Sequence, residues 1–99
     1  MQLIATESVK EKIKFIHSVD FIEAEEAFFN FKGPMLIDDR AVHKSKPNTV
    51  WFISETFEGR LLKLVIIPYL ADELAVLRTA YEPSKEEIEI YESAIQKKA

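Results

Sequence analysis

The segment "TVWFISETFEGRLLKLVIIPYLADELAVLRT", residues 49–79, decides the predicted fold. It holds three runs rich in β-branched and aromatic residues, as strands are, over residues 49–55, 60–69 and 73–79. Only "TFEG" separates the first two runs, and only residues 70–72 separate the last two. Short turns join antiparallel strands, because parallel strands need a long crossover connection. The segment therefore predicts an antiparallel meander.

Three helices are predicted around this meander, because apolar residues recur there at helical spacing. Two precede it, over about residues 9–17 and 21–31, and one follows Pro83. Each begins with a capping-box pattern: Ser8 with Glu11, Asp20 with Glu23, and Ser84 with Glu87. A short strand is also expected at residues 35–38. The sequence thus predicts one α+β domain over residues 1–99. It should contain an antiparallel sheet of about four strands, two N-terminal helices and one C-terminal helix, with the helices on one face of the sheet.

Composition and charge limit the possible classes of protein. The chain has 99 residues, a net charge of −4 and no cysteine. The lack of cysteine excludes a disulfide scaffold, a thiolate zinc site and a cysteine nucleophile, and it fits a reducing cytoplasm. We expect a cytoplasmic protein that does not use the membrane, because no signal-peptide pattern is seen and the longest apolar stretch is too short for a bilayer. The acidic charge argues against general nucleic-acid binding, which depends on a basic excess.

The two long strands are apolar on both of their faces. Regular alternation in the last strand predicts two sets of side chains on opposite faces. The first set is Leu74, Val76, Arg78 and Ala80, and the second is Ala75, Leu77, Thr79 and Tyr81. Because the face away from the helices is only partly polar, we expect a partner or a second copy of the chain to cover it. A homo-oligomer is therefore one prediction.

A set of basic and aromatic residues is the main candidate site. A Lys/Arg/Tyr cluster can cleave RNA without a metal, because a cation stabilises the charge that develops on the phosphate. A Tyr or Lys of lowered pKa would move the proton of the attacking 2′-hydroxyl. The alternative is a set of rim and salt-bridge residues that balance the 17 acidic residues. The set comprises Arg40, Lys44, Lys46, Arg60, Lys63, Arg78 and Tyr81.

Metal and cofactor chemistry have weaker support. Asp38, Asp39 and His43 could together bind a divalent metal, but their spacing matches no specific metal motif, so a solvated loop is the default interpretation. His17 is interpreted as a structural or solvated residue in the last turn of its helix. The chain has no glycine-rich phosphate loop, no G-x-S-x-G elbow and no dinucleotide fingerprint. We therefore predict neither a metal nor a cofactor.

Three segments, in their order along the chain, resemble the BrnT family of toxins. They are "KFIHSVDFIEAEEAF" (14–28), "GRLLKLV" (59–65) and "LRTAYEPSKEEIEIYE" (77–92). BrnT proteins are small RelE-like ribonucleases of bacterial type II toxin–antitoxin pairs. The resemblance covers roughly residues 10–92 and lies in the order and spacing of short motifs. It implies a RelE-like fold, a metal-independent endoribonuclease activity on RNA, and an antitoxin as partner.

The resemblance also compares individual positions. Glu87 and Tyr91 match the family's Glu and Tyr. The family's Ser-Ala-Arg step before the last helix reads Thr-Ala-Tyr at residues 79–81, so Tyr81 stands where the family has its strand-end Arg. RelE-type enzymes do use a Tyr. Together with the chemistry above, this makes Lys63, Arg78 and Tyr81 the candidate catalytic residues, and Lys46 and Arg60 the candidate RNA-binding residues.

Two hypotheses about function follow. The first is a diverged BrnT/RelE-like toxin, a ribonuclease that an antitoxin neutralises. The second is a non-enzymatic interaction module on the same scaffold. The resemblance favours the first, whereas the acidic charge and the replacement of the strand-end Arg by Tyr81 favour the second.

Overall fold

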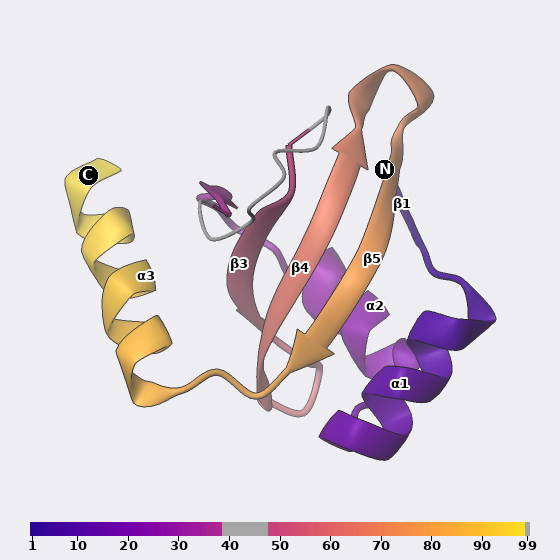
Figure 1. The fold of residues 1–99 in the computed structure, drawn as a ribbon. Coiled ribbons are helices and arrows are strands. Elements are labelled where there is room, and N and C mark those ends of the chain that lie inside the picture. Colours follow the sequence, from indigo (N-terminus) through magenta and orange to yellow (C-terminus); the bar gives the residue numbers. More distant parts are fainter. Residues whose placement is uncertain (39–47, 99) are drawn as a thin grey trace.

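The computed structural model of the chain describes residues 1–38 and 48–98. It confirms an α+β fold (Figure 1). The elements are β1 (Gln2–Ile4), α1 (Glu7–His17), α2 (Phe21–Phe29), β2 (Leu36–Ile37), β3 (Val50–Glu55), β4 (Leu61–Tyr69), a 3₁₀ turn (Leu70–Asp72), β5 (Leu74–Tyr81) and α3 (Lys85–Lys98). In the part of the chain so described, no helix combines the length and the apolar character needed to cross a membrane.

The sheet has five strands in the order β1-β5-β4-β3-β2. The meander of β3, β4 and β5 is antiparallel as predicted, and β2 is antiparallel to β3. The prediction of about four strands, all antiparallel, was wrong at one edge, where β1 runs parallel to β5 and Gln2 pairs with Leu74. A three-residue strand is too short to show a period of two, so only its tertiary pairing reveals it.

Local capping decides where the helices begin. The capping boxes of Asp20 with Glu23 and of Ser84 with Glu87 are both present, so α2 and α3 begin where the sequence predicts. In contrast, α1 begins two residues earlier than predicted, at Glu7, because the Thr6 hydroxyl accepts a hydrogen bond from the Val9 amide at 3.2 Å. The predicted cap at Ser8 therefore lies inside the helix.

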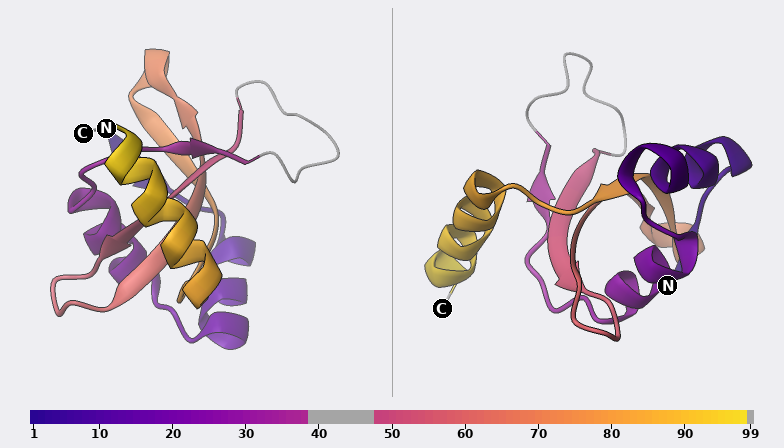
Figure 2. Two further views of the ribbon diagram at one scale, coloured as in Figure 1. Left: turned by 90° about the vertical axis from the view of Figure 1, so that its left-hand side faces the viewer. Right: turned by 90° about the horizontal axis from the view of Figure 1, so that it is seen from below.

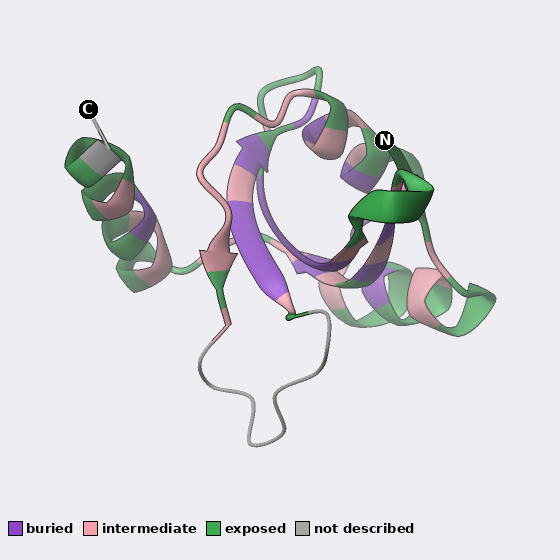
Figure 3. Ribbon diagram, turned by 90° about the horizontal axis from the view of Figure 1, so that it is seen from above, coloured by how far each residue is buried: buried purple, intermediate pink, exposed green. Residues whose placement is uncertain are grey.

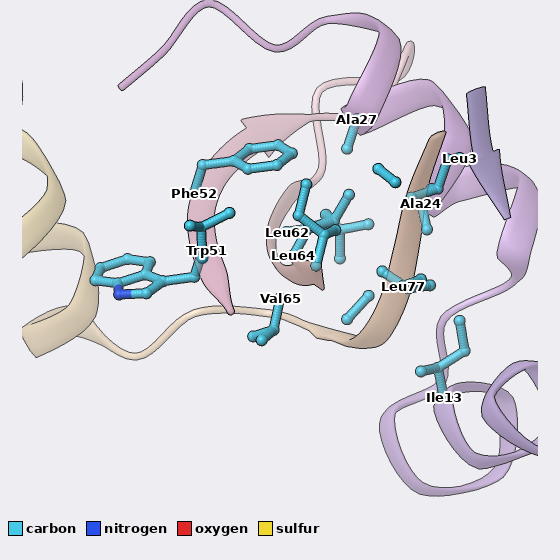
Figure 4. Packing of buried hydrophobic residues seen from close by; sticks show 14 of the residues in the cluster. Leu3, Ile13, Ala24, Ala27, Trp51, Phe52, Leu62, Leu64, Val65 and Leu77 are labelled. Carbon is cyan, nitrogen blue, oxygen red and sulfur yellow. The ribbon is translucent and has the colours of Figure 1, made fainter. Parts of the chain in front are cut away.

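The core lies between α2 and the sheet (Figure 4). Phe52, Leu62, Leu64 and Leu77 are fully buried there. The α2 residues that face them include Ala24 and Ala27, whose small side chains let the helix approach the sheet closely; α1 packs against β5 and contributes Ile13. The rings of Phe28 and Phe31 pack on the ring of Phe52, with centroids 6.4 Å and 4.5 Å away.

A β-bulge at Arg78 reverses the alternation of side chains along β5. Val65 pairs with Thr79 and Ile66 pairs with Leu77, so Arg78 has no opposite residue on β4. Because Val65 and Ile66 face opposite sides of the sheet, Thr79 and Leu77 do so as well. The predicted division of the strand into two faces was therefore wrong. Leu77 and Ala80 share the core face, and Thr79 and Tyr81 share the other.

Helix α3 lies on the opposite face of the sheet from α2 (Figure 2). Trp51 and Phe52 are neighbours in β3 and point to opposite faces; Trp51 packs on Tyr91 of α3, with ring centroids 5.8 Å apart, whereas Phe52 packs on Phe31. The prediction that the helices cover one face was therefore wrong for α3. It covers part of the face for which a partner was expected, while its outer side stays exposed (Figure 3).

Candidate functional site

Lys63 lies where β4, β5 and the first turn of α3 meet. It pairs across the strands with Tyr81, and its ammonium nitrogen lies 2.6 Å from Oε2 of Glu87. Its side chain is only 1% exposed. The capping box with Ser84 holds Glu87 in the first turn of α3, so the helix start delivers the carboxylate to the buried cation.

Both carboxylate oxygens of Glu87 are hydrogen-bonded. Oε2 accepts from Lys63 and, at 2.9 Å, from the Tyr81 hydroxyl, while Oε1 accepts from the Ser84 amide at 2.9 Å. Burial by itself raises the pKa of Glu87, but the hydrogen bonds from Lys63, Ser84 and Tyr81, with the charge of Lys63, outweigh it and lower the pKa to about 2. Glu87 is therefore ionised at neutral pH.

Aromatic rings complete the surroundings of Lys63. Its Nζ lies 4.6 Å from the ring centroid of Trp51 and 5.4 Å from that of Tyr81, both within the range of a cation–π contact. The ring of His17, at the end of α1, packs on Tyr81 with centroids 5.2 Å apart. We call Lys63, Glu87, Tyr81 and Trp51 the Lys63 cluster. Its cation is enclosed by a carboxylate and two rings, so it does not face solvent.

The Lys63 cluster predicts a loss of stability in acid. The pKa of Glu87 is lowered from 4.5 to about 2 on folding, so its contribution is complete above pH 4.5 and is lost as the pH falls through about 2. We expect the free energy of unfolding to drop by about 2 kcal/mol over this range from Glu87 alone, after a reduction for solvent screening. Urea unfolding at about pH 5 and about pH 2.5 measures the drop. In Glu87→Gln it should be smaller by that amount, and an equal drop in both proteins would contradict the assignment.

Arg60, which directly precedes β4, forms hydrogen bonds with three separate segments of the chain. Its Nη1 donates to the Ser18 carbonyl at 3.0 Å and to Glu23 at 2.9 Å, and its Nε donates to Glu82 at 2.8 Å. Burial by itself lowers the pKa of Arg60, but the hydrogen bonds and charges of Glu23 and Glu82 raise it overall. The guanidinium thus ties the end of α1, the start of α2 and the segment after β5 together.

Replacing Arg60 by alanine is expected to destabilise the fold by about 2 kcal/mol, because it leaves the Ser18 carbonyl and the half-buried Glu23 carboxylate without this partner. Thermal and urea unfolding measure the change. Arg78→Ala is the matched control, since Arg78 is exposed, and it should change stability by less than about 0.5 kcal/mol. Equal effects of the two variants would show that the Arg60 contacts contribute nothing.

The structure brings together only part of the predicted site. Lys63 and Tyr81 are in contact. Arg60 instead forms ion pairs with Glu23 and Glu82. Arg78 is exposed at the bulge of β5. Some predictions lie outside the described residues: Lys46, Arg40 and Lys44 of the basic set, and Asp39 and His43 of the possible metal set. Among residues 1–38 and 48–98, no group of three His, Cys, Asp or Glu side chains could hold a metal ion.

Sequence reasoning missed the partners that enclose Lys63. The sequence predicts a capping role and a family match for Glu87, but not its ion pair with a lysine 24 positions earlier. For Trp51 it predicts only a place in a strand. The one available signal was Lys63 itself, a lone charge inside the apolar run "LLKLVII". A buried lysine needs an opposite charge, and the tertiary fold decides which carboxylate comes close enough to supply it.

A groove of about 990 Å³ opens along the edge of the sheet at β3, next to α3. It is lined mainly by residues 29–33, by residues 53–57 and by the α3 residues Ile88, Tyr91, Glu92 and Ile95; we call it the edge groove. Phe29 and Phe57 are 79% and 64% exposed on its lining and pack edge to face, with centroids 6.0 Å apart. Exposed aromatic residues gathered in a groove are typical of binding surfaces.

Comparisons with known proteins assign no family to the chain. No family model, no curated protein and no solved structure matches it. Function is therefore inferred from the two features that the geometry provides, the enclosed Lys63 cluster and the open edge groove.

Proposed function

We propose that the chain is a non-enzymatic interaction module on a RelE-like, toxin-type scaffold, and that it binds another protein. The observation that carries this proposal is the burial of Lys63 and its ion pair with Glu87. A lysine that is 1% exposed and paired with Glu87 at 2.6 Å is not accessible to a phosphate in solvent. Arg60 is likewise engaged on both sides of its guanidinium. Two of the cations that an RNA-cleaving site would use, Lys63 and Arg60, thus stabilise the fold.

The edge groove supports a binding role. Four exposed apolar side chains lie along it: Phe29, Phe57, Leu61 and Ile95. Apolar groups kept in water on a small acidic protein are unfavourable unless a partner covers them, since burial is worth about 25 cal/mol per Å². A protein partner that covers the groove would therefore gain affinity from surface that the isolated chain leaves exposed.

A BrnT-like ribonuclease, neutralised by an antitoxin, is the second candidate. One observation favours it: Lys63, Tyr81 and Glu87 share hydrogen bonds at the strand ends, with His17 against Tyr81, so four groups that can move protons gather in one place. To act on RNA, Lys63 would have to leave Glu87. That step separates a buried ion pair and is strongly unfavourable unless RNA phosphate replaces the carboxylate.

Induced expression of the chain alone, without neighbouring proteins, distinguishes the two functions. Under our proposal, growth continues and cellular RNA stays intact. Growth arrest with RNA loss that Tyr81→Phe and Arg78→Ala both abolish would overturn it in favour of the ribonuclease. Tyr69→Phe is the control for Tyr81→Phe, because it also removes a tyrosine hydroxyl, but an exposed one at the end of β4 away from Lys63. It should leave growth and cellular RNA as they are with the unchanged chain.

A further inference from the structure

We propose that the edge groove binds an extended, apolar segment of a partner protein as an added strand on β3, along the part of its edge that β2 does not cover, and that Lys or Arg residues flank this segment. This inference rests on the proposed binding function and names the mode of binding and the chemistry of the partner. Three observations carry it: the floor of the groove, its two walls and the charges at its rim.

The floor of the edge groove is a strand edge. β2 pairs with β3 only at Val50 and Trp51, so within the described residues no strand lies beside residues 52–55 on that side. The Asp38 amide donates to the Thr49 carbonyl at 2.9 Å, which shows that Thr49 directs its peptide groups to this edge. Peptide groups point to the same edge at every second residue, so those of Ile53 and Glu55 also do.

Side chains now occupy part of this edge. Asn30 donates from Nδ2 to the Glu55 carbonyl at 2.8 Å, and the Tyr91 hydroxyl, which has a backbone hydrogen bond with Ile53, donates to the Pro34 carbonyl at 2.7 Å. In the register of β2, the residue opposite Ile53 would be Pro34, which has no N–H to offer. β2 therefore ends, and side chains substitute for the missing ladder. A partner strand would replace the contacts of Asn30 with Glu55 and of Tyr91 with Ile53 by backbone hydrogen bonds, an exchange of similar bonds.

The two walls of the edge groove lie on opposite faces of the sheet. Phe31 packs on Phe52 and Tyr91 packs on Trp51, and these two β3 residues point to opposite faces. One wall is thus residues 29–33 and the other is α3. Side chains of a strand alternate between the two faces, so an added strand would place apolar residues against both walls. A bound helix would cover the walls but could not extend the hydrogen-bond ladder of the sheet along this edge.

Carboxylates at the rim select the ends of the segment. Glu55 and Glu92 line the groove and are exposed, and Glu58 is exposed in the adjoining turn, against one exposed lysine, Lys32, in the lining. The chain as a whole carries a net charge of −4. A partner segment with Lys or Arg on either side of its apolar residues complements this rim, and the attraction speeds association.

The test begins with selection of binders from a displayed library of random peptides against the purified full chain. We expect enriched peptides with a short apolar, β-branched run flanked by Lys or Arg. Ile95→Glu, on the α3 wall, should weaken the synthesised peptides by about tenfold or more, whereas Ile90→Glu should change binding by less than about twofold. Ile90 is the matched control for Ile95, because both lie on α3 and are 49% and 45% exposed, respectively. Of the two, only Ile95 lines the edge groove. Glu92→Lys and the exposed Glu89→Lys form a second matched pair for the rim charge.

N-methylation of the peptide backbone tests strand addition directly. In an added strand only every second amide donates to the edge, so methylation of one alternate set should weaken binding by about tenfold and of the other set only slightly. Uniform tolerance of methylation would overturn strand addition and indicate a helix or a simple apolar contact. Failure to enrich any peptide, or binding that Ile95→Glu leaves unchanged, would also overturn it.

The two proposals can fail separately. Peptide binding that follows the alternate pattern, together with RNA cleavage on induced expression, would refute the non-enzymatic function and leave the strand site standing. Peptides that bind with equal tolerance to every variant and every methylation would refute the strand site and leave a protein-binding function standing.

Discussion

Replacing Glu87 by alanine is expected to destabilise the protein by about 3 to 5 kcal/mol, a large share of the stability of a small domain. The reason is the charge that remains. Lys63 stays buried between Trp51 and Tyr81, and its ammonium loses the carboxylate 2.6 Å away. The Ser84 amide at the start of α3 loses its partner as well. Urea unfolding at neutral pH measures the change.

Lys63→Met provides the decisive comparison. It removes the buried charge and fills the space between the two rings with a side chain of similar size. Glu87 keeps its hydrogen bonds from Ser84 and Tyr81 and is partly exposed, so we expect a loss of only about 1 kcal/mol. The double variant of Lys63→Met with Glu87→Ala should then be more stable than Glu87→Ala alone. A double variant less stable than both single variants would show that the unpaired charge of Lys63 does not cause the loss in Glu87→Ala.

Replacing Phe52 by alanine is expected to cost about 3 to 5 kcal/mol and to leave the chain largely unfolded near body temperature. Phe52 is fully buried and contacts the rings of Phe28 and Phe31, so its removal leaves a cavity between α2 and the sheet. Thermal unfolding with circular dichroism measures it. Phe57→Ala is the matched control, because that ring is 64% exposed, and it should change stability by less than about 0.5 kcal/mol. A mild effect of Phe52→Ala would mean that the core collapses around the site.

The predictions for Glu87 and Phe52 distinguish what the two faces of the sheet contribute. The face of Phe52 is a conventional apolar core, and its interactions stabilise the domain. The face of Lys63 holds a charged cluster that attaches α3 to the sheet through Glu87 and Tyr91. Because α3 also forms one wall of the edge groove, the Lys63 cluster positions the surface that we propose for binding. The cluster is thus a positioning element for α3.

Local sequence was enough to predict the elements of the fold other than β1. The runs of β-branched and aromatic residues predicted β3, β4 and β5, and the short turns between them predicted their antiparallel order. The pairs Asp20 with Glu23 and Ser84 with Glu87 predicted where α2 and α3 begin. These features depend on interactions between residues close in the sequence, so the pattern of residues contains them.

The sequence by itself thus determined the α+β class, the meander and the starts of two helices. The tertiary structure alone decided that β1 joins β5, that the bulge at Arg78 reverses the faces of β5, and that α3 crosses to the face opposite α2. It also decided that Lys63 is enclosed by Trp51 on β3, Tyr81 on β5 and Glu87 on α3. The physical reason is that burial of a charge depends on partners that distant segments bring together, and no local period of residues records which segments will meet.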